Sequence, residues 1–404
     1  MANLRATMGV AAGVAALTLG ACAPTPAPRA TVAPSSVAAP SASASEMTTL
    51  TSPSAAPAPV SACLQKAQTL TPEEQAGQLL MVGVSTAGLD SATTDAIRRS
   101  KAGSVVLLGS GLTTRQRAAE ISAAVGALGS SRLPMLVAVD QEGGQVQRLR
   151  GEGFTRIPSA VEQGRLDVAD LRAQAEEWGG ELRWAGVRFN LAPTADVVPA
   201  AKVSTNAPIG KLQRHYGTEP EAAAESVRAF VEGMGAAGVA TSLKHFPGLG
   251  EVTENTDFAA ALDTDTVIDD EGWATFLAGI EAGASSVMVS SAVFEQIDPG
   301  VEAVFSERIV TGILRDHLGF DGVVIADDLG AAAAVADTPP GERAVRFLEA
   351  GGDLVINADP GLAAEMSSAI MEAAEADPAF AADVTASVGR VLELKESVDV
   401  GSCD

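Results

Sequence analysis

Histidine and cysteine are scarce in this chain of 404 residues, which has three of each. The histidines are scattered, at His215, His245 and His317, and no histidine and cysteine have the spacing that zinc sites use. There is also no GxGxxG or Walker motif at the start of a helix, and no GxSxG motif for a serine nucleophile. These absences predict a protein without a metal centre, a nucleotide site or another cofactor.

Basic residues are few as well, since 27 lysines and arginines face 51 aspartates and glutamates, for a net charge of −24. Nucleic-acid binding depends on a basic surface that releases the counterions of the phosphate backbone, and the sequence shows no basic stripe. Nucleic acid is therefore excluded as a partner. An acidic chain of this kind suits a neutral ligand, although charge alone does not indicate a fold.

The apolar run near the N-terminus is short. Residues 8–19 follow Arg5, are too few to span a bilayer, and lead into Leu19-Gly20-Ala21-Cys22. This ending resembles the lipobox of bacterial lipoproteins, in which the cysteine is lipidated and becomes the new N-terminus. We expect residues 1–21 to be a lipoprotein signal peptide and Cys22 to anchor the exported protein to the outer face of the cell membrane. An ordinary cleaved signal peptide is the alternative.

Residues 22–62 are nearly all alanine, proline, serine and threonine, without a periodic apolar pattern. Such a segment cannot bury a core, so we expect a disordered tether before a single globular domain at residues 63–404. Cys63 and Cys403 bracket that domain. In an exported protein this pair predicts a disulfide, because the ends of a closed barrel lie close together; two unpaired thiols are the alternative.

Short apolar runs alternate with helical patterns along the rest of the chain. Each run is apolar on successive residues, as is typical of parallel strands covered on both faces. The eight runs are Gly77–Val84, Ser104–Gly109, Pro134–Asp140, Val187–Thr194, Val239–Phe246, Ser285–Ala292, Gly322–Asp327 and Asp353–Asn357. They predict an α/β protein with a (β/α)₈ TIM-like barrel, and a doubly wound sheet is the alternative.

Two of the intervening helices have clear boundaries in the sequence. One is expected at Glu219–Ala237 with Thr218 as its N-cap, and another at Glu307–Leu318 after Ser306.

Polar side chains gather at the ends of the predicted strands, where the functional residues of such barrels lie. They are Asp140-Gln141-Glu142, Asp196, Lys244-His245, Ser290-Ser291 and Asp327-Asp328. Several carboxylates with Lys, Arg and His suit acid/base or covalent chemistry on a neutral polar substrate. Glycoside hydrolysis fits best, because it uses one carboxylate as nucleophile and a second group as acid and then base.

Five segments resemble glycoside hydrolase family 3 in order and spacing. They are VAVDQEGGQVQRLRG from Val137, LAPTADVVP from Leu191, NAPIGKLQRHYG from Asn206, KHFPGLG from Lys244 and LGFDGVVIADDLG from Leu318. More narrowly, the chain resembles the single-barrel β-N-acetylhexosaminidase branch. The resemblance implies that Asp327 is the nucleophile, which forms a covalent glycosyl-enzyme. It also implies that Asp140, Arg148, Arg214, Lys244 and His245 bind the sugar.

The chain departs from that branch after the KHFPG motif. The branch continues with His-Gly and then an Asp-Ser-His triplet whose histidine is its acid/base, whereas this chain has Leu249 and the triplet Asn255-Thr256-Asp257. Asp257 is therefore the candidate acid/base, with Asn255 orienting it. Glu251 and Glu254 are fallback candidates.

The resemblance predicts a monomeric, retaining β-N-acetylglucosaminidase acting on peptidoglycan fragments or muropeptides. A muropeptide-binding lipoprotein with little or no hydrolysis is the alternative, and a phosphorylase is a third option.

Overall fold

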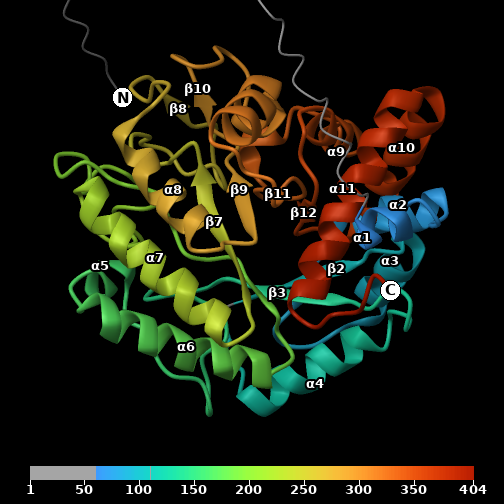
Figure 1. Cartoon of the computed structure of the whole chain (residues 1–404), viewed down its shortest axis with the longest axis horizontal. Helices are drawn as coiled ribbons and strands as arrows, with labels where there is room; N and C mark the ends of the chain where they lie inside the picture. Colours follow the sequence, from blue (N-terminus) through green and yellow to red (C-terminus); the bar gives the residue numbers. More distant parts are fainter. Residues whose placement is uncertain (1–60, 110) are drawn as a thin grey trace, which may run out of the picture. The chain divides into compact units, whose positions relative to one another are not determined.

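Eight parallel strands form a barrel at the centre of the protein, and helices surround it (Figure 1). Neighbouring strands follow the order β11-β9-β7-β6-β3-β2-β1-β12. The Ala326 amide donates to the Leu354 carbonyl at 3.1 Å, and a bridge pairs Ile325 with Leu354, so β11 and β12 meet and close the ring. The barrel prediction is confirmed in all eight strands, and the doubly wound alternative is wrong. The strands are β1 (Leu80–Ser85), β2 (Ser104–Leu108), β3 (Leu136–Val139), β6 (Phe189–Asn190), β7 (Ala240–Phe246), β9 (Ser286–Val289), β11 (Val323–Ala326) and β12 (Val355–Asn357).

This computed structural model describes residues 61–109 and 111–404. The predicted signal peptide, Cys22 and the predicted tether up to residue 60 lie outside the described residues. Across the described ranges, no helix combines the length and apolar character needed to cross a membrane.

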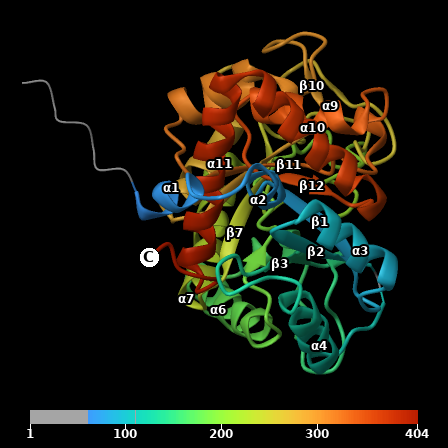
Figure 2. The ribbon, with the colours of Figure 1, turned by 90° about the vertical axis from the view of Figure 1, so that its right-hand side faces the viewer.

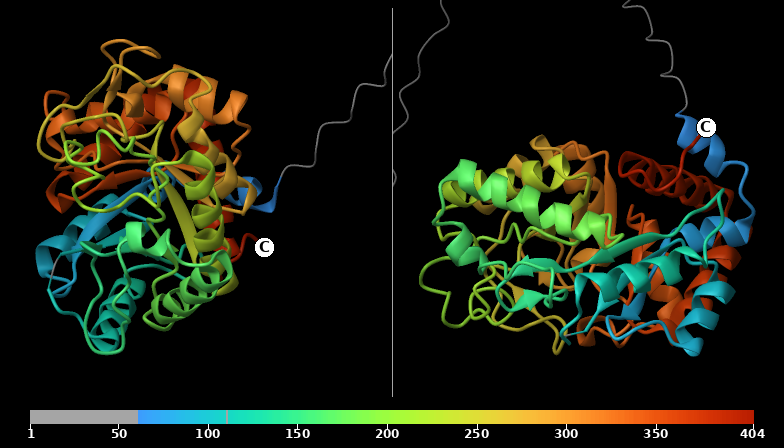
Figure 3. Two further views of the ribbon diagram at one scale, coloured as in Figure 1. Left: turned by 90° about the vertical axis from the view of Figure 1, so that its left-hand side faces the viewer. Right: turned by 90° about the horizontal axis from the view of Figure 1, so that it is seen from below.

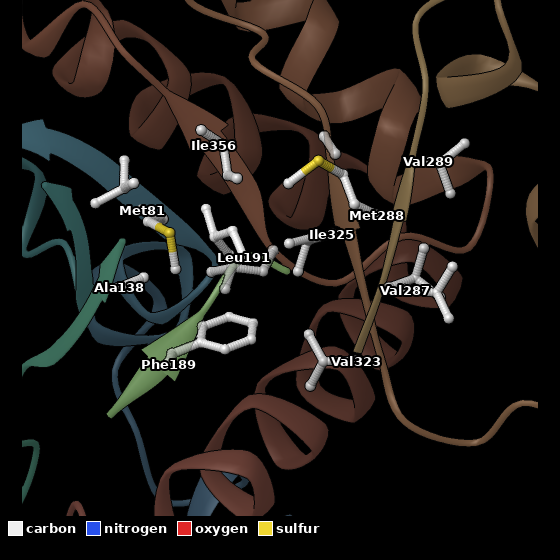
Figure 4. Close-up of a cluster of buried hydrophobic side chains, with 14 of the residues drawn as sticks. Met81, Ala138, Phe189, Leu191, Val287, Met288, Val289, Val323, Ile325 and Ile356 are labelled. Atoms are coloured by element: carbon white, nitrogen blue, oxygen red, sulfur yellow. The ribbon is translucent and has the colours of Figure 1, made fainter. Parts of the chain in front are cut away.

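The barrel strands are buried along nearly their whole length, which explains their runs of consecutive apolar residues. Side chains from different strands meet in the interior, where Met81, Phe189, Leu191 and Ile325 group together (Figure 4). All four are at most 1 % exposed. This core supports the loops that follow the strands.

Helices and short turns connect the strands. The α-helices are α1 (Ala62–Ala67), α2 (Pro72–Gln78), α3 (Ser91–Ser100), α4 (Arg115–Gly126), α5 (Ala160–Gln163), α6 (Val168–Trp184), α7 (Pro220–Ala236), α8 (Ala274–Glu281), α9 (Pro340–Glu349), α10 (Ala363–Ala376) and α11 (Pro378–Ser397). The 3₁₀-helices are η1 (Glu271–Trp273), η2 (Ala303–Phe305), η4 (Ala333–Val335) and η5 (Pro360–Leu362), and η3 (Arg308–His317) is a π-helix. Helices α6 and α7 pack side by side on the outside of the barrel (right panel of Figure 3).

Four short strands lie in the loops. Strands β4 (Gln141–Gly143) and β5 (Val146–Gln147) form an antiparallel pair after β3. Strands β8 (Leu262–Asp263) and β10 (Val293–Phe294) pair in parallel.

Two helix boundaries differ from the expectation. The N-cap of α7 is Glu219 rather than Thr218, because Pro220 is the first helical residue and its fixed φ suits that position. The helix after Ser306 is the π-helix η3, although the Ser306 hydroxyl still accepts a hydrogen bond from the Ile309 amide at 3.2 Å.

The two ends of the barrel unit meet at one place. Helix α1 lies beside α11 and the end of the chain (Figure 2). Cys63 in α1 and Cys403 form a disulfide, with their Cα atoms 4.7 Å apart. Glu396 also holds the C-terminal segment, because its carboxylate accepts a hydrogen bond from the Cys403 amide at 2.7 Å.

We expect reduction of this disulfide to lower the free energy of unfolding by about 2–4 kcal/mol, because the bond closes a long loop in the unfolded chain. The loop joins residues separated by 340 positions. Urea denaturation with and without reductant measures the effect, and the Cys63→Ser/Cys403→Ser variant is the control that must not respond to reductant. Equal midpoints for the oxidised and reduced wild type would contradict a stabilising bond.

Candidate active site

The loops at the carboxyl ends of the strands enclose a cavity of about 360 Å³. All seven residues that the sequence assigned to catalysis or sugar binding line this one cavity. They are Asp140, Arg148, Arg214, Lys244, His245, Asp257 and Asp327. Leu191, Met288 and Ile356 belong both to the buried core and to the cavity lining, so the top of the core forms part of the site. Residues from across the barrel thus converge on one small space.

A buried network of charges fixes the basic side chains of the site. The Lys244 ammonium lies 2.6 Å from an Asp140 oxygen and 2.7 Å from a Glu142 oxygen. The Arg214 guanidinium donates two hydrogen bonds of 2.8 Å, one to each Glu142 oxygen. A planar guanidinium held at two points by one carboxylate has little freedom to rotate. Lys244 and Arg214 are therefore preorganised beside the cavity.

Glu142 is the centre of this network, although no individual role was predicted for it from the sequence. Burial alone would raise the pKa of its carboxyl, but Arg214 and Lys244 outweigh burial and hold that pKa well below its ordinary range. The signal available in the sequence was its position two residues after Asp140 at a strand end. Its assignment as a partner of Lys244 and Arg214 needed the fold, because these residues lie far apart in the chain.

His245 is held on both sides of its ring. Nδ1 lies 2.8 Å from Asp196, whose side chain is fully buried, and the same carboxylate accepts the His245 amide at 3.1 Å. Nε2 lies 3.4 Å from the Arg214 guanidinium. Both ring nitrogens face protein groups, so this histidine is suited to positioning rather than to proton transfer with a leaving group.

Asp327 follows β11 directly and presents its carboxylate to the cavity. Its amide donates to the Val289 carbonyl at 2.9 Å, which fixes the backbone at the end of the strand. Burial raises the pKa of Asp327; His245 lowers it in part, and the nearby Asp257 raises it further. A carboxylate fixed in this way on the barrel rim can attack a carbon atom of a ligand in the cavity.

The adjacent Asp328 is used differently, although it also reaches the cavity lining. Its carboxylate accepts hydrogen bonds from the amides of Gly330, Ala331 and Ala358 at 2.8 to 3.0 Å. Both oxygens of the Asp328 carboxylate therefore accept hydrogen bonds from backbone amides. Asp327, in contrast, accepts one amide hydrogen bond, from Asp328 at 2.9 Å.

Only one of the three carboxylates considered in the loop after β7 lines the cavity. It is Asp257, which is exposed. Glu251 forms an ion pair with Lys202 and lines a different hollow, and Glu254 is not among the cavity residues. The Asn255 side chain accepts a hydrogen bond from the Asp257 amide at 3.0 Å, so it orients the backbone rather than the carboxylate.

Replacing Glu142 by glutamine is expected to lower the free energy of unfolding at pH 7 by about 3–5 kcal/mol, because buried cations lose their carboxylate. The folded-state pKa of Glu142 is depressed, so its contribution is present at neutral pH and is lost as the pH falls. The difference in the free energy of unfolding between the variant and the wild type should therefore become smaller at acidic pH. Urea denaturation at pH 7 and at pH 4 measures it.

The matched control is Glu251→Gln, which makes the same change in the more accessible pair with Lys202. A change within about 1 kcal/mol is expected for such a pair. Equal effects of the two substitutions would show that the buried network does not stabilise the fold.

The comparisons with known proteins agree with this geometry. The model of the glycosyl hydrolase family 3 N-terminal domain matches residues 71–394. A β-hexosaminidase of Xanthomonas axonopodis pv. citri is 36% identical over 301 residues, which cover 72% of this chain and 87% of the relative.

Two solved structures are also similar. The β-N-acetylhexosaminidase of Beutenbergia cavernae is 47% identical with a TM-score of 0.79, and the match covers 81% of this chain and 99% of that one. A family 3 β-N-acetylglucosaminidase from a Paenibacillus species is 29% identical with a TM-score of 0.73, and the match covers 83% of this chain and 64% of that one.

Proposed function

The chain belongs to glycosyl hydrolase family 3, and on that premise we propose that it is a retaining β-N-acetylglucosaminidase that removes terminal GlcNAc residues from peptidoglycan fragments. The chain is a glycoside hydrolase, and its relatives include β-hexosaminidases. The observation that carries the proposal is the convergence of seven predicted residues on one cavity, with Asp327 and Asp257 both on its lining.

The size and charge of the cavity suit one terminal sugar. Its volume of about 360 Å³ is near the lower end of the range for small-molecule sites, about 300–1,000 Å³. Three residues of the buried charge network line the cavity, namely Asp140, Lys244 and Arg214. Together they offer hydrogen-bond acceptors and donors to the hydroxyls of a neutral sugar. A cavity of this kind favours removal of single residues from a chain end over cleavage inside a long glycan.

The reaction is proposed to proceed in two displacements. The Asp327 carboxylate attacks the anomeric carbon while Asp257 donates a proton to the glycosidic oxygen, so the bond to the leaving group breaks. Asp257, now ionised, removes a proton from water, which attacks the anomeric carbon and releases Asp327. Two inversions give net retention of configuration.

The placement of both carboxyls on the lining of one cavity supports this division of labour. Burial raises the pKa of Asp327, and the charge of Asp257 contributes further to that raised pKa. When Asp327 forms the glycosyl ester it loses its negative charge. The ionised Asp257 then no longer faces a like charge while it draws the proton from water.

The proposed setting is the outer face of the cell membrane, with a lipid anchor on Cys22 and a monomeric catalytic domain. The support is the lipobox-like sequence before Cys22, which lies outside the described residues. A relative named β-N-acetylglucosaminidase supports the choice of GlcNAc as the sugar.

Turnover of p-nitrophenyl N-acetyl-β-D-glucosaminide tests the proposed function, with analysis of the sugar product in water and in phosphate buffer. Free GlcNAc of retained configuration is expected in both. Formation of GlcNAc 1-phosphate would show a phosphorylase, and binding of muropeptides by calorimetry without turnover would show a binding protein.

A further inference from the structure

The loop from Leu249 to Phe258, which carries Asp257, is held to the barrel at its beginning. The buried Asn206 side chain donates to the carbonyls of Leu249, Gly250 and Val252 at 2.6 to 3.1 Å. The Leu249 amide donates to Asp196 at 2.7 Å. A side chain at Gly250 would collide with the Val197 carbonyl, so only glycine permits this close approach. These contacts fix the first half of the loop but do not reach Asp257.

A second segment holds the loop where Asp257 lies. The Ala333 amide donates to the Asp257 carbonyl at 3.2 Å, and the Ala334 amide donates to the Thr256 carbonyl at 3.1 Å. Ala333 and Ala334 belong to η4, which lies a few residues after Asp327 in the loop that follows β11. Backbone hydrogen bonds thus connect the loop that carries Asp257 to the segment that follows Asp327. The two side chains also line the same cavity.

The segment of residues 329–338, which we call the clasp, is itself fixed at both ends. Arg343, 6% exposed, donates to the carbonyls of Leu329 and Gly330 at 2.7 and 3.2 Å. It also donates to the carbonyls of Ala336 and Thr338 at 3.3 and 2.6 Å. One guanidinium therefore gathers four carbonyls, two from each end of the clasp.

Asp328 fastens the start of the clasp to the end of β12. Its Oδ1 atom accepts hydrogen bonds from the Gly330 and Ala358 amides, both at 2.8 Å. A Cβ atom at Gly330 would lie 2.2 Å from Asn357 Oδ1, so the clasp approaches β12 as closely as glycine allows. The clasp is therefore a rigid support attached to the barrel.

Asp257 needs such a support, because it is exposed and lies outside any helix or strand. An acid/base group must be held within hydrogen-bonding reach of the glycosidic oxygen, and a misplacement of about 1 Å costs about 100-fold in rate. We propose that the clasp, held by Arg343, positions the Asp257 carboxylate for proton transfer to the leaving group. This rests on the proposed function of Asp257.

The variant Ala333→Pro removes one hydrogen bond from this support with little disturbance of the backbone. Ala333 is exposed and is the first residue of η4, a position where proline is tolerated. Ala332 has φ −65° and ψ 134°, which is the conformation that a following proline requires. The control is Ala333→Val, which adds similar bulk and keeps the amide donor.

The expected result is a selective loss of proton transfer. For Ala333→Pro, kcat/KM for phenyl N-acetyl-β-glucosaminide should fall by about 3- to 10-fold, the effect of one lost hydrogen bond. For the 2,4-dinitrophenyl substrate, whose leaving group needs no proton, kcat/KM should stay within about 2-fold of wild type. Ala333→Val should match wild type on both substrates. Arg343→Lys should show the same selectivity, because lysine lacks the fork that gathers the carbonyls.

The double variant Ala333→Pro/Asp257→Ala separates positioning from general damage. If the clasp acts through Asp257, the proline should cause no further loss once Asp257 is absent. Equal losses on both substrates, or an undiminished proline effect without Asp257, would overturn the inference. The single variant Asp257→Ala separates the failure of the proposed function from the failure of this inference. If its loss of activity does not depend on the leaving group, the acid/base role of Asp257 is wrong. If its loss does depend on the leaving group while that of the clasp variants does not, only the positioning role of the clasp is wrong.

Discussion

Asp327→Ala should lower kcat/KM for p-nitrophenyl N-acetyl-β-D-glucosaminide by about 10⁴-fold or more, because the variant has no group to form the glycosyl-enzyme. Asp327 lines the cavity directly at the end of β11, and its backbone is fixed by the Val289 carbonyl. Alanine keeps that backbone contact and removes only the carboxylate. Initial rates with both proteins at equal concentration measure the effect.

The neighbouring acids provide the comparison for Asp327. Asp321→Ala changes an exposed acid just before β11 and should leave the rate within about 2-fold, as is usual for surface substitutions. Asp328→Ala should destabilise the clasp, because Asp328 accepts amide hydrogen bonds there, and it should retain covalent chemistry. A wild-type rate in Asp327→Ala would refute its assignment as nucleophile.

Asp257→Ala should reduce kcat/KM by about 10²- to 10⁴-fold for phenyl N-acetyl-β-glucosaminide, which needs protonation of its leaving group. The 2,4-dinitrophenyl substrate should be cleaved in the first step at nearly the wild-type kcat/KM. Its overall kcat should fall, because water then attacks the glycosyl-enzyme without a base. Azide, which needs no base, should restore kcat and yield a glycosyl azide of retained configuration.

Glu254→Ala is the matched control for Asp257, because Glu254 is an exposed acid in the same loop and does not line the cavity. It should match wild type on both substrates. If the loss of kcat/KM depended on the leaving group in Glu254→Ala but not in Asp257→Ala, Glu254 rather than Asp257 would be the acid/base. A loss in Asp257→Ala that is equal for the two substrates and unaffected by azide would show that Asp257 has no part in proton transfer.

The barrel could be predicted from the sequence because parallel strands buried on both faces leave a direct record in composition. Most barrel strands are rich in consecutive apolar residues, as in Leu80–Ser85 and Val323–Ala326, and turn residues or polar groups follow them. Most residues of the site could be placed at one cavity because they lie at or just after the carboxyl ends of parallel strands, as Lys244 and His245 do in β7 and Asp327 does after β11. The resemblance to family 3 then distinguished Asp327 from the other acids.

The contacts that hold the site depend on long-range packing, which leaves no local pattern. Glu142 reads as one more acid after a strand, yet it pairs with Arg214, 72 positions away, and with Lys244. The alanines at 331–334 carry no polar side chain, but the amides of Ala333 and Ala334 donate to the carbonyls of Asp257 and Thr256. Backbone hydrogen bonds between two loops do not depend on the identity of the side chains, so they cannot be predicted from the sequence.

The most direct test is to trap the intermediate with a 5-fluoro N-acetylglucosaminyl fluoride and to map the labelled peptide by mass spectrometry. The account predicts one sugar on the peptide that contains Gly322–Gly330, attached to Asp327, and no label on Asp327→Ala. A label on another carboxylate, or steady turnover with no covalent adduct, would contradict it.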